Sequence, residues 1–137
     1  MLVTTHTVIA ATVAIKTGNP YLYFPFAAAD HFAFDTMPHF GGDWVNKNLK
    51  LVTALDAIVG ISIFLAIAFF THSKFSVLIL FAVCLLAGWP DLIWLTKRKH
   101  FPKFKKWHAG IQKFETSPGI ILEIAVVLFC LLLIFVF

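Results

Sequence analysis

The sequence predicts an all-α integral membrane protein that forms a single domain over residues 1–137. Hydrophobic residues make up 60% of the chain and charged residues only 13%, whereas the apolar share of soluble domains is about half. A chain of this length leaves much of its surface unburied, so its composition favours lipid as the solvent. The apolar residues also form long runs separated by prolines, glycines and short polar turns, which is typical of successive helices.

The distribution of basic residues supports the same fold class. Six of the 11 Lys and Arg residues lie in one stretch between two apolar runs, namely Lys97, Arg98, Lys99, Lys103, Lys105 and Lys106. Such stretches are typical of the cytoplasmic loops of membrane proteins. The net charge of +4 therefore does not indicate nucleic acid binding. We expect a protein of the cell membrane whose main partner is lipid.

A short helical hairpin is expected at the N-terminal end. Its first helix covers residues 2–15 and ends at the polar turn 16–20, where Gly18 stops one helix and Pro20 can begin the next. The second helix covers residues 20–36 and ends before Pro38. The first helix is short for a complete span, because crossing a bilayer takes about 20 apolar residues.

Three longer transmembrane helices and one interfacial helix are expected after the hairpin. The ranges 47–70, 75–95 and 118–137 each contain the roughly 20 residues that a span needs. Residues 101–114 mix lysines with aromatic residues at helical spacing, which favours a helix lying along the membrane surface. This segment completes the predicted fold.

The helix order and the basic stretch together predict the orientation in the membrane. If residues 97–106 are cytoplasmic, the preceding helix enters from outside, and the helix at 47–70 starts inside. The N-terminus then lies in the cytoplasm and the C-terminus lies outside. Lys16 and Lys74 stand alone on the outer side, where a single lysine can snorkel to the interface.

Seven ionisable side chains are the candidate metal ligands, because helices of alternating direction bring them to a similar depth near the cytoplasmic face. They are His6, His31, Asp35, His39, Asp56, Asp91 and His108. Ionisable residues inside a membrane are energetically costly and usually functional, so we interpret them as one site. Each has a simpler explanation alone: a single His near a helix end is usually hydrogen-bonded at the interface, and a single Asp can pair with lysine.

The spacing within the second helix gives the most specific signal. His31, Asp35 and His39 are four residues apart, which places them within roughly an 80° arc of one helix face. Two side chains at this spacing can bind the same ion, as the two histidines of an HExxH motif do. A mixture of imidazole and carboxylate ligands suits Zn, Mn or Fe better than Ca or Mg. We expect a divalent metal ion, with Zn as the first choice.

Several stretches resemble a known family. HTVIA at residues 6–10, GNP at 18–20 and DHFAFDTMPH at 30–39 are similar to the small bacterial membrane proteins described as membrane-bound metal-dependent hydrolases. Their pattern is an early His, a short hairpin and then His-x3-Asp-x-x-Pro-His. Pro90-Asp91-Leu92 is similar to a later Pro-Asp segment of such proteins, and Trp107-His108 resembles a later helix that carries a His.

The resemblance implies a metal-dependent hydrolase, and we expect hydrolysis by a metal-activated water. His31, Asp35 and His39 would hold the ion, while Asp56 and Asp91 are the expected catalytic residues that complete the site and accept a proton. Near the headgroups, the expected substrate is a phosphoester or lipid-linked molecule of the cytoplasmic leaflet, attracted by the nearby lysines.

Two other classes of protein remain open on the sequence. A metal-ion or proton transporter also needs ionisable residues in the membrane, usually near its middle. A non-catalytic structural protein needs none of them. The sequence has no Ser or Cys nucleophile motif and no glycine-rich phosphate loop, which disfavours acyl transfer through a side chain and ATP-driven work.

Overall fold

The computed structural model describes residues 2–72, 74–95, 101–111 and 115–136. The elements in these ranges are α1 (Val3–Thr17), α2 (Pro20–Phe34), β1 (His39–Phe40), α3 (Asp43–Lys47), α4 (Leu49–Thr71), α5 (Val77–Leu95), α6 (Pro102–Ile111), β2 (Glu115–Thr116) and α7 (Gly119–Val136). Lys97, Arg98 and Lys99 of the predicted cytoplasmic loop lie outside the described residues. So does the end of the predicted interfacial helix, at residues 112–114.

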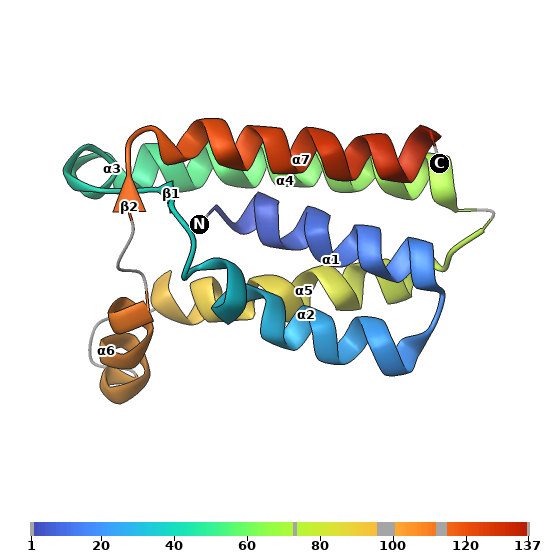
Figure 1. Cartoon of the computed structure of the whole chain (residues 1–137), viewed down its shortest axis with the longest axis horizontal. Helices are drawn as coiled ribbons and strands as arrows, with labels where there is room; N and C mark the ends of the chain where they lie inside the picture. Colours follow the sequence, from blue (N-terminus) through green and yellow to red (C-terminus); the bar gives the residue numbers. More distant parts are fainter. Residues whose placement is uncertain (1, 73, 96–100, 112–114, 137) are drawn as a thin grey trace.

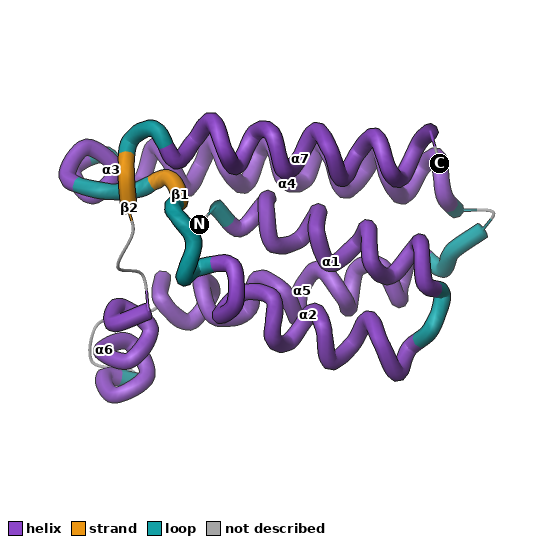
Figure 2. The backbone as a smooth tube through the Cα atoms, viewed as in Figure 1, coloured by secondary structure: helices purple, strands orange, loops and turns teal. Residues whose placement is uncertain are grey.

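The five longest helices form a bundle with α1 at its centre (Figure 1). Helix α1 contacts α2, α4, α5 and α7, and Figure 2 shows α4 and α7 on one side of it and α2 and α5 on the other. The expected N-terminal hairpin is present, because α1 ends at Gly18 in the left-handed conformation and α2 begins at Pro20. The all-helical prediction is confirmed.

Small side chains explain why α1 can occupy the centre. Ala10, Ala11 and Ala14 are almost completely buried, and they let neighbouring helices approach closely. The neighbours contribute glycines opposite the start of α1. A Cβ atom at Gly60 of α4 would lie 2.7 Å from the Thr4 hydroxyl oxygen, and one at Gly88 of α5 would lie 3.0 Å from a Val3 methyl group. Small residues on α1, α4 and α5 therefore let these helices pack closely.

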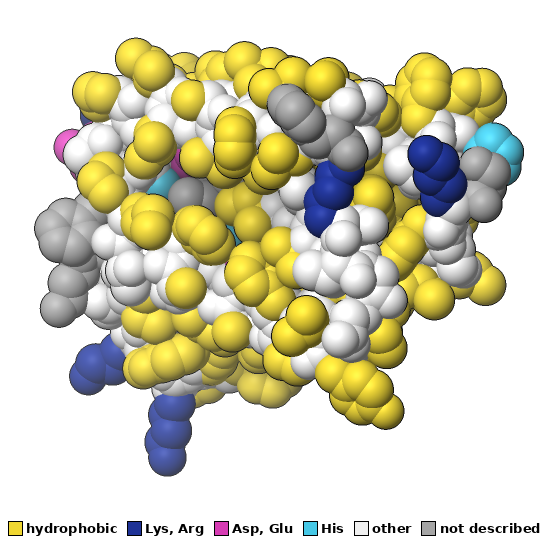
Figure 3. Space-filling view, turned by 45° about the vertical axis from the view of Figure 1, so that its right-hand side comes forward, with side chains coloured by type: hydrophobic (Ala, Val, Ile, Leu, Met, Phe, Trp, Pro, Cys, Tyr) yellow, Lys and Arg dark blue, Asp and Glu magenta, His cyan; other side chains and the backbone are white. Residues whose placement is uncertain are grey.

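Large apolar side chains cover the outside of the bundle. Helix α4 exposes Leu55, Ile58 and Phe69, and α7 exposes Ile121 and Leu128, each by more than half. Figure 3 shows hydrophobic side chains over most of the visible face, with few lysines among them. Helices α4 and α7 are long and apolar enough to cross a membrane, whereas α5 contributes a shorter apolar segment, Val77–Ile93.

The connections differ from the sequence-based expectation. A short parallel ladder pairs β1 with β2, with His39 opposite Glu115 and Phe40 opposite Thr116. The short helix α3 precedes α4, so the third predicted helix begins at Leu49. Periodicity does not reveal two-residue strands, because they are too short to show an alternating pattern.

Gly119 gives a test of the contact between α7 and β1. A Cβ atom at Gly119 would overlap the carbonyl group of His39 and would lie 2.6 Å from the Phe40 nitrogen. We expect Gly119→Ala to lower the free energy of unfolding in detergent by about 1–3 kcal/mol, because backbone atoms must move apart. Gly110→Ala on α6 is the matched control, since its Cβ meets nothing within 4 Å. Equal losses of unfolding free energy in both variants would show that the contact between Gly119 and β1 does not stabilise the fold.

Candidate metal centre

The end of α2 presents the first two site residues. His31 lies in the last turn of α2, and Asp35 caps its C-terminus by donating its N–H to the His31 carbonyl oxygen at 3.0 Å. The helix cannot continue far beyond this point, because Pro38 disfavours a helical conformation at the residue before it. The four-residue spacing therefore places both side chains on the same face of the final turn, as the sequence predicts.

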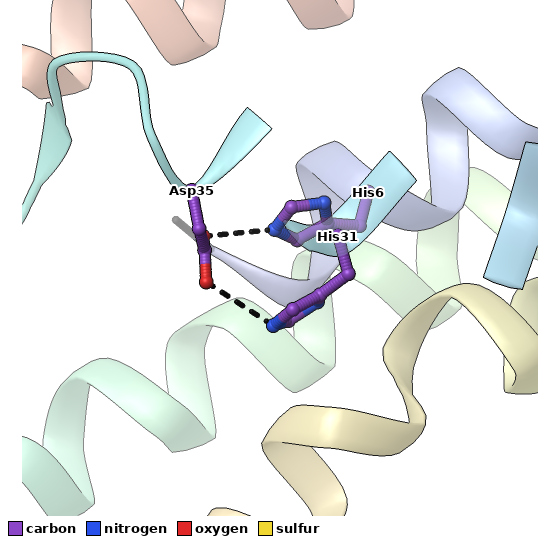
Figure 4. Close-up of side chains that lie close together, drawn as sticks. All are labelled: His6, His31 and Asp35. Carbon is purple, nitrogen blue, oxygen red and sulfur yellow. Dashed lines mark hydrogen bonds and ion pairs between the residues drawn. The ribbon is translucent and has the colours of Figure 1, made fainter. Parts of the chain in front are cut away.

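Three imidazoles from three different helices contact the carboxylate of Asp35. The Nε2 atoms of His31 and His108 both lie 3.2 Å from its Oδ2, and His6 Nε2 lies 3.3 Å from its Oδ1. Figure 4 shows His6 of α1 and His31 of α2 with their rings directed at the two oxygens of Asp35. His108 comes from α6. Asp35 is therefore the residue that joins three helices at one point.

A second carboxylate lies near the same ring nitrogen of His31. Asp91 of α5 has its Oδ1 3.6 Å from His31 Nε2, and His108 Nε2 lies 2.9 Å from the same nitrogen. Two sets of three ligand atoms each fall within 4.8 Å of one another: His6, His31 and Asp35, and then His31, Asp91 and His108. The two sets share His31, so the five residues form one continuous cluster.

Burial makes this cluster electrostatically demanding. The side chains of His6, His31, Asp35 and His108 are almost completely inaccessible to solvent, and Asp91 is partly buried. An ionised carboxylate is unfavourable in such a site unless it has partners, and the imidazoles of His6, His31 and His108 lie within 3.2–3.3 Å of the Asp35 oxygens. The carboxylate of Asp35 therefore depends on these imidazoles.

The donor set fits a divalent transition metal ion. Ligands about 2.0–2.2 Å from a tetrahedral ion lie roughly 3.3–3.6 Å from one another. The contacts between donor atoms in the cluster are 2.9–3.6 Å long. The second oxygen of Asp91 is also buried, with no hydrogen-bond partner among the described residues. Nitrogen and carboxylate donors at these separations favour Zn, Mn or Fe.

Aromatic rings surround the histidines and hold α6 against the bundle. The His6 and His31 rings stack with their centroids 4.1 Å apart, and His108 stacks on Phe104 at 5.8 Å. Phe32 of α2 contacts the Trp107 ring at 5.0 Å. Helix α6 therefore contacts α2 through Trp107 and Phe32 as well as through His108, which lies against Asp35.

Two predicted ligands are not in the cluster. His39 follows the end of α2 on β1, where its Nδ1 donates to the Met37 carbonyl oxygen at 2.8 Å. Asp56 of α4 accepts hydrogen bonds from the N–H groups of Val3 and Thr4, at 2.9 and 3.3 Å. It therefore caps the N-terminus of α1, which explains a carboxylate in this apolar helix without a metal ion.

Two further buried acids were not among the predicted ligands. Asp30 of α2 is 2% exposed, and neither of its carboxylate oxygens has a hydrogen-bond partner among the described residues. Glu123 of α7 is 1% exposed and accepts hydrogen bonds from three residues. The sequence alone shows both acids within apolar helices. This position indicates a buried carboxylate that needs a partner.

Comparison of the chain with protein-family models, with curated proteins and with solved structures found no match. The case for a function therefore depends on the residues of the cluster and their geometry.

The separate positions of Asp35 and Asp56 give a direct test. We expect Asp56→Asn to destabilise the fold by about 0.5–2 kcal/mol through the weakened cap of α1, while bound metal is retained. Asp35→Asn should instead remove most of the bound metal, because it replaces the central anionic ligand. Elemental analysis and unfolding curves of both purified variants measure these effects. Equal metal loss in the two variants would place Asp56 at the metal site.

Proposed function

We propose that this protein is a membrane-embedded, metal-dependent hydrolase. The convergence of three histidines and two aspartates from four helices supports the proposal most strongly: His6, His31, Asp35, Asp91 and His108. A merely structural bundle does not need five ionisable side chains in contact, because burying them is unfavourable without a compensating partner. A divalent cation supplies that partner.

The chemical roles follow from the positions of the donors. His6, His31, His108 and Asp35 would hold the ion, for which Zn is our first choice and Mn or Fe are alternatives. When bound, such an ion polarises an ester or phosphoester oxygen and makes a coordinated water more acidic. Asp91 has one oxygen near His31 and a second, buried oxygen without a hydrogen-bond partner among the described residues. We assign proton transfer from the attacking water to Asp91.

The surface of the protein supports a position in the membrane. Two helices, α4 and α7, have the length and hydropathy of membrane spans, and the exposed side chains around them are large and apolar. We propose a multi-pass arrangement with the N-terminus in the cytoplasm. The start of α1, the end of α2, the end of α5 and helix α6 then lie together at the cytoplasmic side (Figure 1).

The position of the cluster also favours a class of substrate. Lys103 and Lys106 of α6 are exposed close to His108, which comes from the same helix. Basic side chains at a membrane surface attract anionic headgroups. We therefore propose a phosphoester or lipid-linked substrate of the cytoplasmic leaflet.

A metal-ion or proton transporter is the second candidate. It needs the same residue types, but such sites usually lie near the middle of the membrane, with access from both sides. The start of α1 and the end of α2 lie at the same end of the bundle (Figure 1), and they carry His6, His31 and Asp35 of the cluster, which favours the hydrolase. Metal-dependent release of phosphate or alcohol from lipid phosphoesters, without metal uptake into vesicles, would favour the hydrolase over the transporter.

The central test is whether the cluster serves one metal site. His31→Ala and Asp35→Asn should each strongly reduce bound metal and hydrolysis, and the double variant should lose little more, because both residues act on the same ion. Metal should raise the melting temperature of the wild-type protein by mass action, and chelation should remove that increase. Wild-type protein that is purified without chelator and holds no metal would rule out the hydrolase.

The orientation gives a further prediction. In a variant without Cys84 and Cys130, a cysteine at position 103 should react with a membrane-impermeant thiol reagent only after the cells are opened. A cysteine at position 72, in the turn after α4, should react in intact cells. The reverse pattern would invert the proposed topology, and the metal site would then face the outside.

A further inference from the structure

Glu123 connects three separate parts of the chain through its carboxylate. Its Oε2 accepts hydrogen bonds from the Leu2 N–H at 2.9 Å and from the Thr5 hydroxyl at 2.8 Å. Its Oε1 accepts the N–H of Phe40 at 2.7 Å. The residue lies just over one turn into α7 and is 1% exposed. One buried side chain therefore ties α7 to the start of α1 and to β1.

Two of the three donors are the immediate neighbours of candidate ligands. Thr5 precedes His6, whose Nε2 lies 3.3 Å from Asp35. Phe40 follows His39, whose Nδ1–H is donated to the Met37 carbonyl oxygen. The Nε2 atom of His39 is consequently left with a lone pair, and it is buried without a hydrogen-bond partner among the described residues.

The bond to Phe40 shows that Glu123 does more than cap a helix. Asp56 accepts the Val3 and Thr4 N–H groups at the start of α1, and the N–H that Glu123 accepts there belongs to Leu2, the residue before the helix. Oε1 instead holds β1, the two-residue strand that carries His39. Gly119 lies one turn before Glu123 on α7 and packs against the backbone of His39. Helix α7 thus fixes the backbone on which His39 sits.

We propose that Glu123 is a positioning residue of the metal centre, which sets His6 for metal binding by fixing the start of α1 against α7 and β1. The inference rests on the proposed metal site and extends it, because it assigns a role to α7, which supplies no ligand to the cluster. His39 itself lies outside the cluster, and its strand β1 is the second segment that Glu123 ties to the start of α1. The carboxylate needs both oxygens for this role, since each one holds a different segment.

The test uses the full-length protein in detergent, with Co²⁺ as the probe. The visible absorption of bound Co²⁺ reports the number and geometry of its ligands. Glu123→Gln keeps the side-chain shape but replaces one acceptor oxygen with an NH₂ donor. We expect it to weaken Co²⁺ binding by about 10–100-fold and to change the absorption bands, as the loss of a support for a ligand does. Glu115→Gln is the matched control, because Glu115 is exposed and accepts one N–H, from Gly42.

Thr5→Val provides a second variant if Glu123→Gln does not fold. It removes one hydrogen bond to Glu123 and leaves the carboxylate and Phe40 in place. We expect a smaller change in affinity and spectrum in the same direction. Glu123→Asp, which keeps both oxygens, should restore part of the wild-type signal. Helix content measured without metal shows whether each variant is folded.

The outcomes separate this inference from the proposed function. Wild-type protein that binds no Co²⁺ would overturn both. Wild-type binding with unchanged affinity and spectrum in folded Glu123→Gln, or in Thr5→Val where the former does not fold, would overturn only the role of Glu123. A lower melting temperature with an unchanged Co²⁺ spectrum would show that Glu123 supports the fold alone.

Discussion

The buried carboxylate of Asp35 is the constraint on which the functional end of the protein depends. An isolated carboxylate in a low-dielectric interior is strongly unfavourable, so partners must come to it. Here the partners are His6, His31 and His108, which belong to three helices. Each helix can satisfy Asp35 only in a narrow range of positions, so packing and site geometry determine each other. The same constraint explains why the cluster suits a cation, because a metal ion is the strongest partner available to clustered imidazoles and carboxylates.

The interior of the bundle contains many polar side chains beside its apolar core. Threonines, histidines and acids are buried together with alanines, valines and isoleucines, whereas leucines, isoleucines and phenylalanines are also exposed on α4, α5 and α7. Some buried hydroxyls are satisfied within their own helix; Thr12, for example, donates to the Val8 carbonyl oxygen at 2.7 Å. The N–H groups in the first turn of α1 cannot be satisfied in this way, because they have no acceptor within the helix. Asp56 accepts the N–H groups of Val3 and Thr4, and Glu123 accepts that of Leu2, the residue before the helix, so two acids lie beside the start of the central helix.

Much of the fold and part of the site are visible in the sequence because they depend on local patterns. Apolar runs of helical length and their Gly and Pro boundaries give the helices and the N-terminal hairpin. The spacing of His31 and Asp35 places them on one helix face, and alternating helix direction predicts that His6 and Asp91 approach them. The structure brings these four residues together with His108. The all-helical prediction also follows from composition and periodicity alone.

The sequence by itself therefore determined which segments are helical and which ionisable residues share one end of the bundle. Only the tertiary structure decided how those residues divide between a candidate metal cluster and the support of α1. Asp56 has the same sequence signal as Asp91, yet it binds the backbone of α1 while Asp91 lies beside His31. His39 continues the spacing of His31 and Asp35, but the helix ends first and β1 carries it away from that face. The physical reason is that helix periodicity is local, whereas the acceptor that a buried donor finds depends on chain segments far away in the sequence.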